Sequence, residues 1–259
     1  MATRAGFTLI DVLVSIAVIA VLIGILLPSI ASVNETARRV MCQSNIRQIG
    51  LGVIMYADEN KRMLPSTVFL PEQIGYAGRG GLDDRPQEMV TLRLGANYSR
   101  NGPQSWDGLG NLFSQGYLSA PKVFYCPSHH GEAPFSRYAS VWTAEEKEEI
   151  VGNYHFRGEG PMMLTSAGSP NAATTRELYK IDPGQSSLIA DGLRSQSDYN
   201  HKVGVNFFRA DLTVHWFSDP GSSLASILPV DKNASSSATV DGAWRLFDQS
   251  ANQGGPVGQ

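Results

Sequence analysis

The chain has 259 residues, which is long enough for one globular domain together with a membrane anchor. Its formal net charge is -3 and its longest basic run is the pair Arg38-Arg39, so nucleic acid is not an expected partner. The two cysteines, Cys42 and Cys126, are too few for a disulfide scaffold and are wrongly spaced for a zinc cluster.

The N-terminus carries a long apolar segment over residues 7–31, whose polar members include Asp11. About 20 apolar residues cross the hydrocarbon core of a bilayer, so we expect a transmembrane helix over about residues 8–30. The small residue Gly6 lies before this segment, whereas an ordinary secretory signal has its cleavage site after the apolar core. Cleavage at Gly6 would remove a leader of residues 1–6 and leave the anchor on the mature protein. Arg4 in this leader favours a cytoplasmic N-terminus.

The helical pattern continues beyond Pro28 but becomes amphipathic. Five apolar residues follow a 4-3-4-3 spacing and make one stripe: Cys42, Ile46, Ile49, Val53 and Tyr56. We therefore expect one helical unit over residues 7–62, on the order of 80 Å long. Its first half belongs in lipid or a helix bundle, and the stripe of its second half should lie against a globular head.

The head is expected over residues 63–248, with glycine and proline predicting many loops. Residues 187–190 read as a strand, and residues 203–208 and 213–217 read as an antiparallel hairpin with a turn at 210–212. The fold class is α+β, with the long helix packed on a small antiparallel sheet.

Two further segments of the head and tail have local signals. Thr143-Ala-Glu-Glu146 fits a capping box and predicts a short helix over about residues 144–151. The end of the chain, residues 249–259, is rich in Gly, Gln and Ser, and we expect a flexible tail there.

The segment Gly6-Phe7-Thr8-Leu9-Ile10-Asp11, followed by the apolar run, resembles the prepilin cleavage and methylation motif of type IV pilins and pseudopilins. Pro28 stands where many pilins carry a proline. The resemblance implies a pilin-like fold, cleavage between Gly6 and Phe7, and N-methylation of the new Phe7 amine. Asp11 stands where the family usually has Glu, which keeps the charge but shortens the side chain by one methylene.

Later segments are similar to one large bacterial subfamily of such proteins. Members share a Cys-x-Ser/Asn-Asn-Leu-Lys-Gln-Ile-Gly stretch, matched by residues 42–50, and often a Tyr-Cys-Pro-Ser stretch, matched by residues 125–128. They end with a His-x9-Asp-Gly segment; His201 and Asp211 have its spacing, but Leu212 replaces the glycine. Glycine would tolerate a positive φ in this turn and leucine would not.

Three features leave alternatives open. An acid on an apolar helix costs roughly 2.5–3.5 kcal/mol at the bilayer centre, so Asp11 should pair with the Phe7 amine of a neighbouring subunit, or else reach the headgroups. Pro28 should bend or loosen the helix, either for packing in a filament or as an ordinary kink. Cys42 and Cys126 form a disulfide in an oxidising compartment, or remain two buried thiols.

The five histidines, with Asp191 and Asp211, invite comparison with a metal or hydrolase centre. None has a metal-ligand spacing on a predicted element, and the chain has no GxSxG, HExxH or P-loop motif. We therefore expect no catalytic residue, no metal and no cofactor. His201 and Asp211 are expected to tie the hairpin together by hydrogen bonding.

The expected function is that of a prepilin-like structural subunit of a type IV pilus or a type II secretion-like filament, with no enzymatic activity. Its expected partners are a prepilin peptidase, the inner membrane, and other copies or related pilin subunits. Before assembly it would cross the inner membrane once, with the head outside the cytoplasm, and could then enter a surface or periplasmic filament. The alternative is a membrane-tethered extracytoplasmic binding module or enzyme that uses the helix only as an anchor. A plain anchor needs neither the Gly6-Phe7 site nor Asp11.

Overall fold

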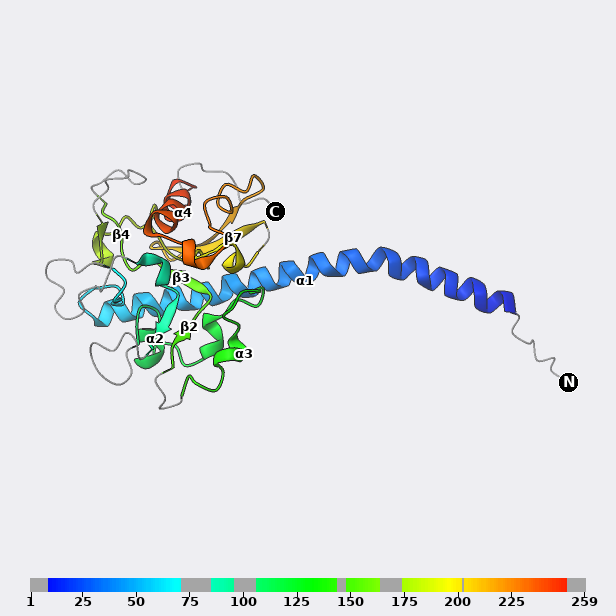
Figure 1. The fold of residues 1–259 in the computed structure, drawn as a ribbon, viewed down its shortest axis with the longest axis horizontal. Coiled ribbons are helices and arrows are strands. Elements are labelled where there is room, and N and C mark those ends of the chain that lie inside the picture. Colours follow the sequence, from blue (N-terminus) through cyan, green and yellow to red (C-terminus); the bar gives the residue numbers. More distant parts are fainter. Residues whose placement is uncertain are drawn as a thin grey trace.

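A single long helix organises the computed structural model, which describes residues 9–70, 85–95, 106–143, 148–163, 174–201 and 203–250. This helix, α1 (Leu9–Glu59), has 51 residues and is therefore about 76 Å long. Figure 1 shows its N-terminal half leaving the head as a curved rod, while its C-terminal half lies along the head. The predicted helix and the α+β class are both confirmed.

The predicted stripe is the face that α1 buries in the head. Its five members, from Cys42 to Tyr56, are all at most 5% exposed. Gly50 lies on the same side, where an added Cβ atom would come within 2.4 Å of the Phe208 ring. Glycine at this position therefore lets the helix backbone lie directly on the sheet.

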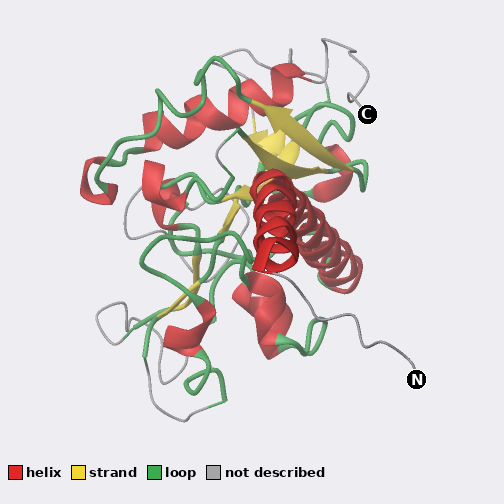
Figure 2. Ribbon diagram, turned by 90° about the vertical axis from the view of Figure 1, so that its right-hand side faces the viewer, coloured by secondary structure: helices red, strands yellow, loops and turns green. Residues whose placement is uncertain are grey.

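The head is built on a four-stranded antiparallel sheet in the order β3-β6-β7-β8. Its strands are β3 (Tyr154–Phe156), β6 (Ser187–Asp191), β7 (Gly204–Arg209) and β8 (Val214–Ser218). The three predicted strands are present, the two hairpin strands each displaced by one residue. Every residue of β7 is buried, because α1 covers one face of this sheet and a second helix covers the other (Figure 2).

This second helix, α4 (Ser237–Ser250), was missed by the sequence reasoning. Its buried residues Val240, Ala243, Trp244 and Phe247 have the i, i+3, i+4, i+7 spacing of an amphipathic helix. Asp248 connects it to the sheet by accepting from the Ser187 backbone N–H at 2.9 Å and from Arg157 at 2.7 Å. The predicted flexible tail thus begins too early, since residues 249–250 end α4; residues 251–259 lie outside the described residues.

Short elements complete the head. Two small ladders pair β1 (Thr91–Arg93) with β2 (Ile150–Val151), and β4 (Gly160–Pro161) with β5 (Thr174–Thr175). Within the described ranges, the other helices are α2 (Gly110–Ser114), α3 (Phe135–Tyr138), and the 3-10 turns Pro86–Glu88, Pro121–Phe124, Leu178–Lys180, Gln196–Asp198 and Lys232–Ala234.

The helix expected over about residues 144–151 is wrong at its C-terminal end. Ile150 and Val151 form a buried strand that pairs with β1, and residues 144–147 lie outside the described residues. A capping box is worth only about 1 kcal/mol, which the burial of two apolar side chains against β1 exceeds.

The turn between β7 and β8 corrects a second expectation. Asp211 accepts from the backbone N–H of Thr213 at 3.0 Å and so stabilises the turn itself. His201 lies at the other end of β7, bridged to Gly204, and does not contact Asp211. Six strand residues at about 3.3 Å each separate the two positions by roughly 20 Å, so they cannot tie the hairpin together.

Leu212 occupies this turn with a φ of +69°. A left-handed conformation costs a residue with a Cβ atom about 1–2 kcal/mol, and glycine avoids this cost. The turn therefore keeps the geometry suited to the glycine of the related segment, with a strained leucine in its place.

We predict that Leu212→Gly stabilises the head by about 0.5–1 kcal/mol, the relief of strain less the greater freedom of glycine in the unfolded chain. Thermal unfolding of the full chain in detergent should show a melting temperature higher by about 2 °C. Leu212→Ala is the matched control, because it removes the side chain but keeps the Cβ atom, and it should not stabilise. Equal stabilisation by both variants would show that the exposed side chain, rather than the backbone, is the cause.

Candidate functional site at the junction of α1 and the head

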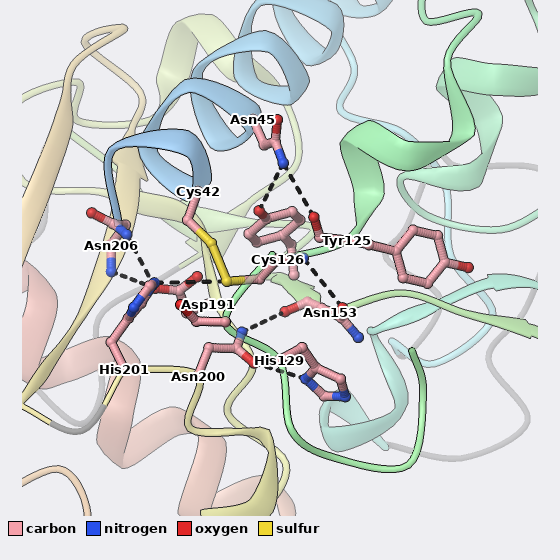
Figure 3. Close-up of a disulfide and its surroundings, with 12 residues drawn as sticks. Cys42, Asn45, Tyr125, Cys126, His129, Asn153, Asp191, Asn200, His201 and Asn206 are labelled. Carbon is pink, nitrogen blue, oxygen red and sulfur yellow. Dashed lines mark hydrogen bonds and ion pairs between the residues drawn. A yellow bond between two sulfur atoms is a disulfide. The ribbon is translucent and has the colours of Figure 1, made fainter. Parts of the chain in front are cut away.

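A disulfide joins α1 to the head at Cys42 and Cys126, with the two Cα atoms 5.3 Å apart (Figure 3). Cys42 comes from the buried stripe of α1, and Cys126 follows the 3-10 turn Pro121–Phe124. Both residues are buried. Of the two alternatives that the sequence left open for these cysteines, the structure contains the disulfide.

Side-chain amides hold the segment around Cys126 in place. Asn45 of α1 donates to the carbonyl oxygen of Tyr125 at 3.1 Å and to the hydroxyl of Tyr154 at 3.3 Å. Asn153 accepts from the backbone N–H of Cys126 at 3.2 Å. These bonds replace the ladder hydrogen bonds that this irregular segment lacks, and they position the sulfur atom of Cys126.

His201 connects α1, the sheet and the disulfide. Its Nδ1 atom lies 2.7 Å from Oε1 of Glu35 on α1. Its Nε2 atom lies 3.8 Å from Oδ2 of Asp191 and 3.7 Å from Sγ of Cys126. The imidazole is 1% exposed and the Glu35 side chain 45% exposed, so the contacts with Asp191 and Cys126 are buried, whereas the contact with Glu35 lies at the surface.

Glu35 was missed by the sequence reasoning. It also accepts from the hydroxyl of Ser128 at 3.2 Å. A signal was present, because Glu35 precedes Cys42 by seven residues, which is two helical turns and therefore the same face of α1. An acid on the extension of an apolar stripe indicates a polar partner on the head.

Asp191 is the most deeply buried acid of this region, at the end of β6. Its Oδ2 atom accepts from the backbone N–H of Asn206 at 2.7 Å. Its Oδ1 atom is buried without a hydrogen-bond partner among the described residues. Burial raises the pKa of Asp191, and the neighbouring His201 and the bonds from Asn206 oppose this rise.

A cation–π contact lies beside the same junction. The guanidinium of Arg39 stands 3.6 Å over the ring of Trp216 on β8, and the same indole packs edge-on against His201. Such a contact contributes about 0.5–2 kcal/mol. Glu35, Arg39 and Cys42 thus contact the head on successive turns of α1. We call Cys42, Cys126, Asp191 and His201 the junction cluster.

The other predicted site residues are apart from this cluster. Asp11 lies exposed in the first turn of α1, and its backbone carbonyl accepts from Ser15 at 2.7 Å. Gly6 and Phe7 lie outside the described residues. The backbone remains helical through Pro28, so α1 is not broken there.

Three of the remaining histidines have structural partners. His129 bonds Asn200 at 2.7 Å, His155 bonds the carbonyl oxygen of Pro86 at 2.7 Å, and His215 bonds the hydroxyl of Thr213 at 2.6 Å. Complete burial lowers the pKa of His155 to about 4, which keeps it neutral at physiological pH. Each of these histidines thus has one structural partner, while Nε2 of His129 and Nδ1 of His155 are buried without a hydrogen-bond partner among the described residues.

Comparison with protein families gives one match. Residues 31–192 match the model of a family described as a protein of unknown function, DUF1559. The matched range includes both cysteines, Glu35 and Asp191, and ends before His201. No curated protein and no solved structure matches the chain.

We predict that His201→Ala lowers the free energy of unfolding by about 1–3 kcal/mol, because Glu35 loses its partner and the buried Asp191 loses its nearest imidazole. Chemical denaturation of the full chain measures this change. The exposed His130 provides the control, since His130→Ala should change stability by less than about 0.5 kcal/mol. Equal effects of the two substitutions would contradict a stabilising role for the His201 contacts.

Proposed function

The chain belongs to the DUF1559 family, and we propose that it acts as a prepilin-like structural subunit of a type IV pilus or a type II secretion-like filament. In this proposal a prepilin peptidase cleaves between Gly6 and Phe7 and the new amine is methylated. The subunit waits in the inner membrane with its head outside the cytoplasm, and then joins other copies or related subunits. The observation that carries the proposal is the distribution of apolar surface along α1.

The N-terminal half of α1 is apolar and uncovered. It is long and apolar enough to cross a membrane, with a mean hydropathy of 3.0 over its best 18-residue window and none of that window buried in the chain. Its large apolar side chains, from Leu9 to Leu27, are about half exposed or more. Exposed apolar surface of this extent needs lipid or protein to cover it. This supports an anchor before assembly and a packed helix after it.

The C-terminal half of α1 also exposes apolar side chains on the side that faces away from the head. Val33, Val40, Leu51 and Met55 lie on this face and are 45–66% exposed, with the exposed polar residues Ser44, Arg47 and Gln48 between Val40 and Leu51. Met55 is 46 residues, or about 69 Å, from the start of α1, far beyond a hydrocarbon core of about 30 Å. A helix that served only as an anchor would have no need of apolar side chains so far from the membrane. A helix that packs among the helices of neighbouring subunits would bury them, and this favours the filament over the tethered module.

Asp11 supports the same proposal from the other end of α1. It lies four residues after the proposed new N-terminus, so one helical turn separates the carboxylate from the Phe7 amine along the axis. In a filament, the amine of an incoming subunit would meet the Asp11 carboxylate of a subunit already present. Loss of solvent in the assembled core strengthens this attraction and makes a misplaced charge costly.

We predict that the mature protein starts at a methylated Phe7, as read by mass spectrometry of its N-terminal peptide. Gly6→Val should leave the full-length precursor in the membrane, because a branched side chain replaces the small residue at the proposed cleavage site. Gly24→Val is the matched control within α1, where an added Cβ atom has no neighbour within 4 Å, and cleavage should continue. A mature membrane protein that still begins at Met1 or Ala2 would refute the processing step.

We predict that Asp11→Ala is cleaved and inserted normally but assembles poorly. A lost charge-assisted contact of about 1.5–3 kcal/mol shifts the equilibrium between filament and membrane about 10- to 100-fold toward the membrane. The measurement compares subunits in sheared filaments with subunits that remain in the membrane. Asp11→Glu should assemble, and Ser15→Ala, one turn further along the exposed face, serves as the control. If Asp11→Ala assembles like the parent, the tethered-module alternative is favoured.

A further inference from the structure

The junction cluster brings together four side chains that are common metal ligands. The two sulfur atoms, a ring nitrogen of His201 and a carboxylate oxygen of Asp191 all lie within 4.8 Å of one another (Figure 3). All four residues are at most 5% exposed. They come from α1, the segment after Phe124, β6 and the segment before β7, so only the folded head assembles them.

The orientation of His201 is that of a metal ligand. An ionised Glu35 can only accept a hydrogen bond, so the Nδ1 atom of His201, 2.7 Å away, carries a proton. This leaves Nε2 to face the interior of the cluster. Histidines that bind metals usually donate from their other nitrogen to a carboxylate or carbonyl in this way, which fixes the ring and its tautomer.

Asp191 supplies an independent observation. Its Oδ1 atom is buried without a hydrogen-bond partner among the described residues. Buried carboxylate oxygens are normally bonded or bound to a metal, since an unsatisfied one costs about 1–3 kcal/mol or more. The other oxygen of this carboxylate, Oδ2, lies 3.8 Å from Nε2 of His201, so a cation bound between these two atoms would offset the charge of a buried carboxylate that is not fully hydrogen-bonded.

We propose that the reduced form of the junction cluster is a tetrahedral site for Zn²⁺ or a similar thiophilic divalent ion, bound by Cys42, Cys126, His201 and Asp191. A dithiol reductant first transfers two electrons and two protons to the disulfide, and is itself oxidised to a disulfide. The metal then displaces the two thiol protons as the thiolates bind. This proposal differs from the expectation, drawn from sequence spacing alone, that the chain has no metal site.

The existing distances are compatible with this change. Ligand atoms of a tetrahedral zinc site lie about 3.3–3.8 Å apart, given metal–ligand bonds of about 2.0–2.3 Å. The Nε2 atom of His201 is already 3.7 Å from Sγ of Cys126 and 3.8 Å from Oδ2 of Asp191. The main movement required is the separation of the two sulfur atoms by rotation of the cysteine side chains.

An entry path lies beside Cys126. An open hollow of about 460 Å³ is lined by residues of α1 and the head, including Met41, Asn45, Tyr125 and Cys126. This hollow brings solvent as far as Cys126, so a small reductant or a metal ion has only a short distance to cross to the disulfide. The consequence is that α1 and the head remain tied in both redox states, by a covalent bond when oxidised and by a metal when reduced.

The test uses the full chain in detergent. Thiol labelling of denatured protein should find no thiol before reduction and two per chain after treatment with a phosphine reductant. After removal of the reductant, the reduced chain should bind one Zn²⁺ per molecule, measured by elemental analysis after gel filtration. Co²⁺ should give the intense near-ultraviolet band of thiolate-to-metal charge transfer. The oxidised chain should do neither.

Variants separate a built site from adventitious binding. Asp191→Asn and His201→Gln should weaken Zn²⁺ binding at least tenfold, and Cys42→Ser with Cys126→Ser should abolish it. Glu35→Gln keeps all four ligands and should weaken binding about tenfold through the orientation of His201. His130→Gln should have no effect.

Several outcomes would overturn the proposal. One is equal binding by the oxidised chain or by the double serine variant. Another is a reduced parent that stays folded and takes up no metal, or that unfolds and is not recovered by added Zn²⁺. Circular dichroism of each variant distinguishes loss of a ligand from loss of the fold. If a ligand variant does not fold, Glu35→Gln still tests the site, because it leaves all four ligands in place.

Discussion

The packing of the α1 stripe on the sheet is the interaction on which the rest of the structure depends. Ile46, Ile49 and Val53 are completely buried, and each contributes about 1.5–3 kcal/mol as an upper estimate. β7 is buried on both faces only because α1 covers one of them and α4 the other. The helix is therefore part of the head's core. Its C-terminal half therefore cannot be removed without opening the core, whereas its uncovered N-terminal half contributes nothing to that core.

Sequence periodicity predicted α1, its buried face and the central strands, because these features repeat within a few residues. It missed α4, whose Val240, Trp244 and Phe247 pattern lies in a segment rich in Ser, Asn and Gly. The polar composition of this segment predicted a loop, whereas the spacing of its apolar residues, taken alone, predicts the helix α4. The sequence raised the geometry of the turn at Leu212 but did not predict it. A leucine in place of glycine could mean either that the turn adopts another conformation or that leucine adopts a positive φ, and the structure shows the second.

The candidate site was less predictable than the fold, for a physical reason. Glu35 and His201 are 166 positions apart, and Cys42 and Cys126 are 84 apart. No local pattern encodes such contacts. The sequence reasoning considered His201 and Asp191 among possible ligands and set them aside because their spacing fits no metal motif. Ligands that come from four separate segments have no characteristic spacing, and only the tertiary fold shows that they meet.

The position of the junction determines how far the N-terminal half of α1 can tilt relative to the head. Glu35 is where α1 first bonds to the described part of the head. Residues 9–34 of α1 extend beyond it and form an arm of about 39 Å. A tilt of about 10° at the base of this arm displaces its tip sideways by about 7 Å, which approaches the distance of about 8–10 Å between the axes of packed helices. A contact between Asp11 and a neighbouring helix would then be lost. The hydrogen bond of Glu35, the stacking of Arg39 and the cross-link at Cys42 lie on consecutive turns where the arm begins, which is where they restrict tilt most. The rigidity of the junction is thus a requirement of any function that depends on the position of the N-terminal end of α1 relative to the head.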